Sequence, residues 1–345
     1  MRSKVGRGSE RDRRWKSKSQ KAIRRDRTLL RAAPSMGLHE PPPPFPIPVD
    51  RFVEECDGDD PAQAAQCCAA FATLATQVPV PRDFRGATRT LMELVERTGD
   101  GFGRVTKESA TAAMAALLAT VPGADKNLVN RGVVDKLVAA SIADEEDETP
   151  RGPAAADQEG GGSPETKRGG VNGMGSLTLN SLECIRILAA SEHGVPELMR
   201  NDSAMAFATK RCDDGDPRIA EGACDFLCAL ASRGEAQRTR VRERGGVTAL
   251  AKGLARHGKG NTHVGFRALL GLAMTCAQDG EAQAELVNVP GVVQALLATQ
   301  RSDDAAMAGI AKDLWGSIGK NPELKKVVME ALRADVERAK AAESA

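Results

Sequence analysis

Three stretches of this sequence follow one pattern: Val241-Arg-Glu-Arg-Gly-Gly-Val-Thr-Ala-Leu250, Leu286-Val-Asn-Val-Pro-Gly-Val-Val-Gln-Ala-Leu296 and Leu128-Val-Asn-Arg-Gly-Val-Val-Asp-Lys-Leu137. In each, an apolar helix end meets a short break at glycine and then a new apolar helix start. A weaker copy surrounds Ser203. From Ser203 to Gly246 is 43 residues, and from Gly246 to Gly291 is 45. A purely helical period in the low forties predicts an α-solenoid.

A further apolar helix follows each break after a polar stretch. Ile310, Leu314 and Ile318 recur at steps of four and predict one buried stripe. Phe266, Leu269, Leu270 and Ala273 share a face in the same way. These helices are expected at 110–121, 177–190, 219–231, 264–276 and 305–318.

One repeat contains an insertion. Gly132 to Ser203 spans 71 residues, about 28 more than one period allows. The excess lies in 143–170, which opens Asp-Glu-Glu-Asp-Glu and continues into a Gly160-Gly-Gly162 tract. It has no apolar stripe, so we expect a disordered acidic and glycine-rich loop.

Composition narrows the class of protein. Of 345 residues 41% are apolar but only 3% aromatic, so alanine, leucine and valine must form most of the core, which suits packed helices. No apolar run is long enough for a transmembrane helix, and the N-terminus lacks the apolar segment of a secretory signal. The eight cysteines include no CxxC pair and mostly lie among alanines and leucines, as free core thiols do in a reducing compartment.

A short helix-breaking glycine within a three-helix unit of this length resembles the armadillo repeat. The resemblance covers about residues 50–344. It implies an all-α fold: a right-handed α-solenoid of about five repeats near 79–121, 126–191, 192–234, 235–280 and 281–320. A starting helix is expected at 61–77 and a closing helix at 323–343. The predicted domains are a basic disordered arm (1–31), a Pro-rich linker (32–48) and the repeat domain (49–345).

The charge is distributed unevenly along the chain. Residues 1–31 carry thirteen Lys/Arg against three Asp/Glu, whereas the rest carries 35 against 44. A basic arm on an acidic body is typical of an interaction tail. The stretch Arg11-Asp-Arg-Arg-Trp-Lys-Ser-Lys18 and the arginines after Ala22 resemble the importin-β-binding segment of importin α. The candidate contact residues are Arg13, Arg14, Trp15, Lys16, Lys18, Arg24 and Arg25.

The likeness to importin α is incomplete. That family holds the extended lysines of localisation signals with a Trp and an Asn four residues apart on successive third helices. If Lys107-Glu-Ser-Ala110 is aligned with the family's Glu-Ser-Ala, those positions are Thr111 and Ala115 here. Trp315 is followed four residues on by Gly319. Without the aromatic shelf and the amide clamp, a divergent relative or a generic armadillo scaffold is the better interpretation.

Motifs for catalysis or cofactors are weak. Gly253-Leu-Ala-Arg-His-Gly-Lys-Gly260 fits GxxxxGK, but Gly260 stands where a phosphate-binding loop needs Ser or Thr, and the segment ends a helix instead of following a strand. Cys224 and Cys228 share a helix face without further ligands at zinc spacing, so core packing is favoured. We therefore expect no enzyme, no cofactor and no metal.

The predicted function is protein binding by an adaptor or scaffold, with third-helix side chains contacting a partner segment along a concave groove. The acidic body would prefer basic partners. One alternative is a nuclear transport adaptor that recruits importin β through residues 1–31. A second is an RNA- or ribosome-associated armadillo protein whose arm contacts phosphates. The arm could also be a localisation signal, a transit peptide or a plain tail. No membrane partner is expected, and the location is the cytoplasm, the nucleus or both.

Overall fold

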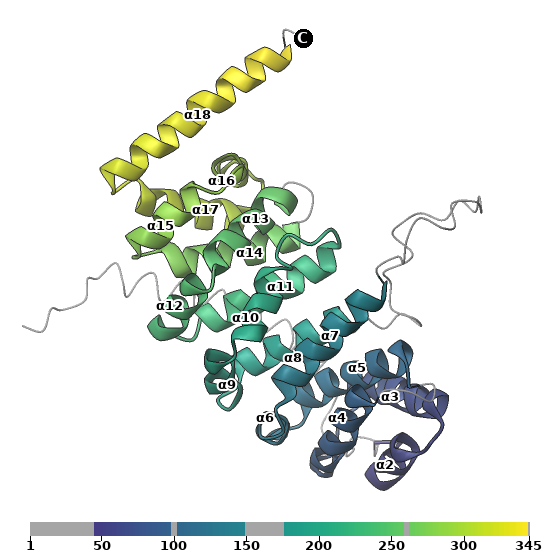
Figure 1. Cartoon of the computed structure of the whole chain (residues 1–345). Coiled ribbons are helices and arrows are strands. Elements are labelled where there is room, and N and C mark those ends of the chain that lie inside the picture. The colour runs from purple at the N-terminus through teal and green to yellow at the C-terminus, as the bar shows by residue number, and fades with distance from the viewer. Residues whose placement is uncertain (1–44, 98–101, 149–175, 259–261, 344–345) are drawn as a thin grey trace, which may run out of the picture. The chain divides into compact units, whose positions relative to one another are not determined.

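The structure is a computed structural model that describes residues 45–97, 102–148, 176–258 and 262–343. In this part of the chain 17 α-helices and one 3-10 helix occur, with no strand (Figure 1). Two helices precede five three-helix units, and one long helix follows them. The second of the two leading helices packs on the first third helix and is counted with the third helices below. The all-α fold predicted from the sequence is confirmed.

The helices can be given in chain order. Those from the start to the second unit are α2 (Val49–Asp57), α3 (Pro61–Ala75), η1 (Arg82–Ala87), α4 (Thr88–Glu96), α5 (Arg104–Thr120), α6 (Ala124–Val129), α7 (Val133–Glu148) and α8 (Leu177–Ala190). The later ones are α9 (Gly194–Arg200), α10 (Asp202–Thr209), α11 (Pro217–Ala231), α12 (Glu235–Glu243), α13 (Gly246–His257), α14 (Thr262–Cys276), α15 (Gly280–Val287), α16 (Val292–Gln300), α17 (Ala305–Ile318) and α18 (Pro322–Glu343).

Glycine makes the predicted breaks between the first and second helices of a unit. Gly132, Gly245 and Gly291 have φ values of 69°, 74° and 80°, a region that residues with a side chain rarely adopt. The chain can therefore reverse within one or two residues. In the fourth unit the left-handed residue is Gly245, and Gly246 already begins α13.

Aspartate sets the start of several third helices. Asp60 accepts hydrogen bonds from the backbone N–H groups of Ala62 and Gln63, and Asp216 accepts one from Arg218. A proline follows each aspartate at the first helical position, where its missing N–H costs nothing. The Asp-Pro pairs thus fix where α3 and α11 begin.

The predicted stripes lie in the core with two exceptions. Leu269, Leu314 and Ile318 are at most 2% exposed, but Phe266 and Ile310 are only half-buried. Each of the last two lies at the border between the core and the outward face of a third helix.

The inserted loop was predicted at 143–170, but α7 continues to Glu148, so residues 143–148 are helical and not part of a loop. Its last turns are held by partners that are distant in sequence. Glu145 accepts hydrogen bonds from Arg211 and, at 3.4 Å, from Thr178, and Asp144 lies 3.6 Å from Arg104. These contacts keep the acidic run helical without an apolar stripe. Residues 149–170 lie outside the described residues.

The described part of the Gly253–Gly260 motif, from Gly253 to Gly258, lies in α13 and its C-terminal cap. Gly253 lies inside α13, where a Cβ would come within 2.5 Å of the carbonyl oxygen of Cys212. Gly258 caps the helix, and Lys259 and Gly260 are not among the described residues. Close packing of α13 on the turn that follows α10 explains the first glycine of the motif.

Candidate partner-binding face on the third helices

The third helices form one row. α3 packs on α5, α5 on α8, α8 on α11, α11 on α14, and α14 on α17. Each contributes a stripe of exposed or half-buried residues on the side that its neighbours leave uncovered. We call these stripes together the third-helix face; its members include Gln66, Ala112, Ala115, Ala119, Glu183, Arg186, Glu221, Asp225, Phe266, Arg267 and Gly309.

Four charged residues cross the middle of this face. Arg186 on α8 donates to the Glu183 carboxylate, with its Nε 2.6 Å from Oε2, and the same Nε lies 3.5 Å from Oδ2 of Asp225 on α11. Arg267 on α14 places its Nε 3.4 Å from the other oxygen of Asp225. We call Glu183, Arg186, Asp225 and Arg267 the charged ladder. Its side chains are 18 to 44% exposed, so it presents both signs of charge to a partner.

The face is different on α5. Here the outward residues include Ala112, Ala115 and Ala119, so this part of the surface is apolar. Thr111 is fully buried and its hydroxyl donates to the Lys107 carbonyl at 2.7 Å. Neither Thr111 nor Ala115 can therefore offer the aromatic shelf or the amide clamp of importin α.

Trp315 also lacks the asparagine that would complete a signal-binding pair, as the sequence indicates. Trp315 is half-buried on α17, and Gly319 is the residue that caps this helix. The pair does not form the Trp and Asn combination of a signal-binding groove.

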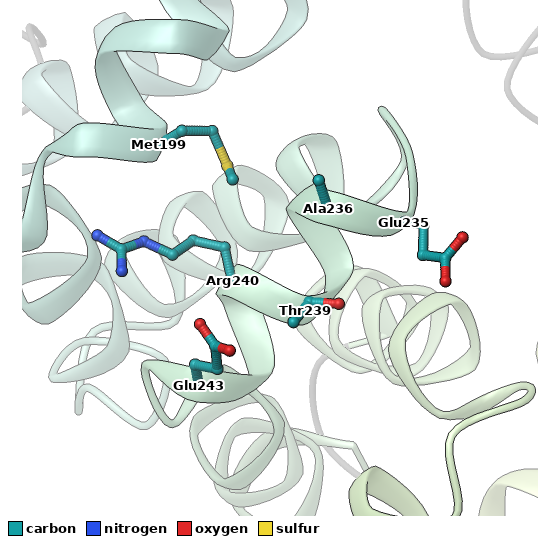
Figure 2. Close-up of a pocket in the computed structure, with 6 residues that line it drawn as sticks. All are labelled: Met199, Glu235, Ala236, Thr239, Arg240 and Glu243. Carbon is teal, nitrogen blue, oxygen red and sulfur yellow. The ribbon is translucent and has the colours of Figure 1, made fainter.

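A cavity of about 720 Å³ lies outside the third-helix face (Figure 2). Its lining comes from Met199 at the end of α9 and from five residues of α12, among them Arg240 and Glu243. Arg240 pairs with Asp202, and Arg244 reaches the same carboxylate at 2.6 Å. These arginines tie the fourth unit to the third, which is a structural role.

A second cavity, of about 610 Å³, adjoins the N-terminal end of the third-helix face. Gln63, Gln66 and Cys67 of α3 line it together with Pro46 and Ile47 from the segment before α2. A partner that follows the row of third helices would reach this cavity at its first helix.

The cysteines pack as the sequence predicts. All eight are free and buried, including Cys224 and Cys228. Burial raises the pKa of Cys276 to about 12, and it raises the pKa of Cys184 well above its usual range. Such thiols are neutral at physiological pH. No group of metal-ligating side chains occurs within the described ranges.

The predicted contact residues of the basic arm, Arg13 to Arg25, all lie outside the described residues. Their role stays a prediction. Sequence reasoning did not single out the charged ladder, whose members come from three different repeats. The sequence does contain one signal for the ladder: charged residues at positions 186, 225 and 267 are separated by 39 and 42 residues, close to the repeat period.

Comparison with known proteins shows which solved structures share this fold. No protein-family model matches the sequence, and no curated protein matches it. Among solved structures, the designed armadillo repeat protein YIII(Dq)4CqI is 17% identical, with a TM-score of 0.57 over 78% of this chain and 99% of that one. Computationally designed armadillo repeat proteins for modular peptide recognition match at 17% identity and a TM-score of 0.58, over 78% and 99%.

A third neighbour is the designed armadillo repeat protein YIII(Dq.V1)4CPAF in complex with the peptide (KR)4. It is 15% identical, with a TM-score of 0.56 over 79% of this chain and 99% of that one. The described chain is thus an α-solenoid. More narrowly, its fold is that of an armadillo-like solenoid, as the sequence predicts.

The described helices differ from membrane spans. None of them combines the length and the apolar character required to cross a bilayer.

Proposed function

We propose that this protein is a non-enzymatic adaptor or scaffold of the cytoplasm or nucleus that binds a segment of a partner protein along the third-helix face. The observation that carries the proposal is the unbroken row of six third helices with the charged ladder across its middle. The structural neighbours support it, since two of those described are designed for peptide recognition or are bound to a peptide.

The spacing of the row explains how a segment would be held. Packed helices lie about 8–10 Å apart, so a partner crossing the row meets a new third helix at that interval. The charged ladder offers hydrogen-bonding groups at three successive steps. Phe266, half-buried beside Arg267, whose guanidinium carbon lies 5.9 Å from the ring centroid, adds an apolar contact.

To test the proposal, peptides that bind the full chain are selected from a displayed library. Their affinity is then measured for variants of the protein in which a bulky side chain blocks the third-helix face. Ala119→Trp and Gly309→Trp place an indole on the third-helix face, and a Cβ at Gly309 meets nothing within 4 Å. Gly280→Trp, at the start of a first helix, is the matched control because its Cβ also meets nothing within 4 Å.

We expect the two third-helix variants to weaken selected peptides at least about tenfold, and the Gly280 variant to leave them unchanged. The proposal would be contradicted if both third-helix variants bound the selected peptides as tightly as the unaltered chain, or if the selection yielded no binder. Circular dichroism of each variant shows whether the fold persists.

The basic arm supports a second candidate function. Arg13, Arg14, Trp15, Lys16, Lys18, Arg24 and Arg25 would recruit importin β by charge, with a cargo held by the third-helix face. Removing residues 1–31 should abolish importin-β binding near 0.15 M salt if this holds. Equal binding, or none, by the full chain and the shortened chain would exclude this function.

The other alternative for the arm is contact with RNA or ribosomes. Its signature is a steep loss of affinity between low and physiological salt, because each phosphate contact releases counterions. A titration of the full chain with single-stranded RNA at two salt concentrations tests it. Affinity that does not change with salt would rule out this use of the arm.

A further inference from the structure

One stripe of α12 carries a carboxylate on either side of a threonine. Glu235, Thr239 and Glu243 follow one another at steps of four residues, so they lie on one face of the helix. Both glutamates are exposed. All three residues line the cavity of about 720 Å³ that α9 and α12 border (Figure 2). The α12 wall of this cavity therefore has an acidic residue near each end. We call these three residues the α12 stripe.

The rest of the cavity lining is apolar except for one arginine that is already paired. The Met199 side chain extends from α9 toward α12, and Ala236 lines the cavity from α12 (Figure 2). Arg240 forms an ion pair with Asp202, so its charge is balanced within the chain. The cavity thus presents an apolar floor and a negatively charged rim.

One stripe of α18 has the complementary character. Lys325, Met329 and Arg333 also recur at steps of four residues, and all three are exposed. Met329 is one of three exposed large apolar side chains among the described residues. The neighbouring residues Leu324 and Val328 are buried where α18 packs on its own chain. The stripe of Lys325, Met329 and Arg333, which we call the α18 stripe, is left uncovered.

The two stripes match in spacing and in charge. Each has two charged residues eight positions apart, which is about 12 Å along a helix, and an uncharged residue midway. The charged pair is acidic on α12 and basic on α18. Residues at steps of four form the ridges that interlock when two helices pack. Methionine is flexible enough to fill an irregular gap, so Met329 suits a cavity that Met199 borders.

We propose that the α18 stripe of one copy of this chain docks on the α12 stripe of a second copy. Lys325 and Arg333 pair with the two glutamates, and Met329 enters the cavity. A second copy is the occupant because its α18 carries the complementary charges at the spacing that α12 presents. Each copy has both stripes, so a symmetric dimer contains the contact twice. The cavity lies outside the third-helix face, so this contact does not depend on the proposed function.

Sedimentation equilibrium of the full chain at about 0.15 M salt measures the self-association. We expect a reversible dimer to form below about 100 μM. One variant reverses the α18 charges with Lys325→Glu and Arg333→Glu, and another reverses the α12 charges with Glu235→Lys and Glu243→Lys. Each should weaken the dimer at least about tenfold, because like charges then face each other. All four positions are exposed, so the fold should persist, which circular dichroism checks.

The matched control reverses two exposed cations that belong to other units. Arg131→Glu combined with Lys210→Glu makes the same change in net charge as the α18 variant. It should change the dimer affinity less than about twofold, because neither residue belongs to a stripe.

A mixture of the two reversed chains tests the pairing itself. Each reversed chain repels its own copies, but its altered stripe is complementary to the altered stripe of the other chain. The mixture should therefore regain dimers within about threefold of the original affinity, which an unfolded variant could not do. A monomeric unaltered chain at about 100 μM, a dimer that either reversal leaves unchanged, or a mixture that stays monomeric would overturn the proposal.

Discussion

The two ends of the repeat array are closed by different means. At the N-terminal end Phe45, Phe52, Phe71 and Phe84 form five ring pairs with centroids 5.0 to 5.8 Å apart. At the C-terminal end α18 packs on α15 and α16 through Leu324 and Val328, while Met329 is 45% exposed. An end repeat has only one neighbour, so each end must cover apolar surface by its own means.

This difference indicates which end of the array should unfold first. Half of the eight phenylalanines gather in the N-terminal cluster, and Phe45 comes from the extended segment before α2. Aromatic side chains bury more area per residue than leucine or valine, so this end should resist unfolding. The C-terminal end relies on a few aliphatic contacts of one helix and should open first.

The largest expected effect is on the aromatic end. Phe71 is fully buried and contacts the three other rings, so Phe71→Ala should destabilise the chain by about 3–5 kcal/mol. Urea unfolding measures the loss. Hydrogen exchange should place it in α2 to α5 and leave α14 to α17 protected, because repeats couple only to their neighbours. A loss below about 1 kcal/mol would mean that the cluster does not hold this end.

The aliphatic end should respond less. Leu324 is 7% exposed and lies at the start of α18, which packs on α15 and α16, so Leu324→Ala should cost about 2 kcal/mol, at the lower limit for buried leucines. Faster hydrogen exchange in α18 and α16 is the measurement. If Leu324→Ala costs as much as Phe71→Ala, the two ends are equally well closed and the comparison fails.

The helices themselves could be predicted from the sequence. α8 and α17 begin and end at the expected residues, because apolar stripes of helical period are local signals. The glycine breaks were found for the same reason. α2 was not predicted as a helix, and α7 was ended too early: its last turn depends on Arg104 and Arg211, which are far away in sequence.

The candidate site was harder to predict. Arg186 and Asp225 become neighbours only after two repeats are stacked, and no local pattern reports that contact. Packing between repeats, and not propensity, determines this contact.

A smaller effect tests the role of the segment before α2. Phe45 is half-buried and its ring lies 5.2 Å from that of Phe84, so Phe45→Ala should cost about 1 kcal/mol. A chain shortened to begin at residue 49 should lose the same amount, whereas one that begins at residue 44 should lose nothing. Equal stability of the two shortened chains would show that Phe45 does not contribute to closing this end.

The smallest effect concerns the middle of the array, where polar contacts between repeats add to the apolar core and neither end contributes. His193 lies 3.1 Å from Asp125, and although burial alone would raise the pKa of Asp125, hydrogen bonds from His193, the Lys126 backbone and Ser191 lower it. A lowered folded-state pKa gives stability that is present above the unfolded value of about 3.9 and is lost as pH falls through the folded value.

The stability difference between the unaltered chain and Asp125→Asn should therefore be steady at about pH 5 and shrink below about pH 4. Its size should stay under about 1 kcal/mol, because His193 is 47% exposed and solvent screens the pair. Asp303→Asn, which alters an exposed carboxylate, is the control and should show no such trend. A difference that grows as the pH falls would mean that this carboxylate is not stabilised in its charged form and that the pair does not help to join the middle repeats.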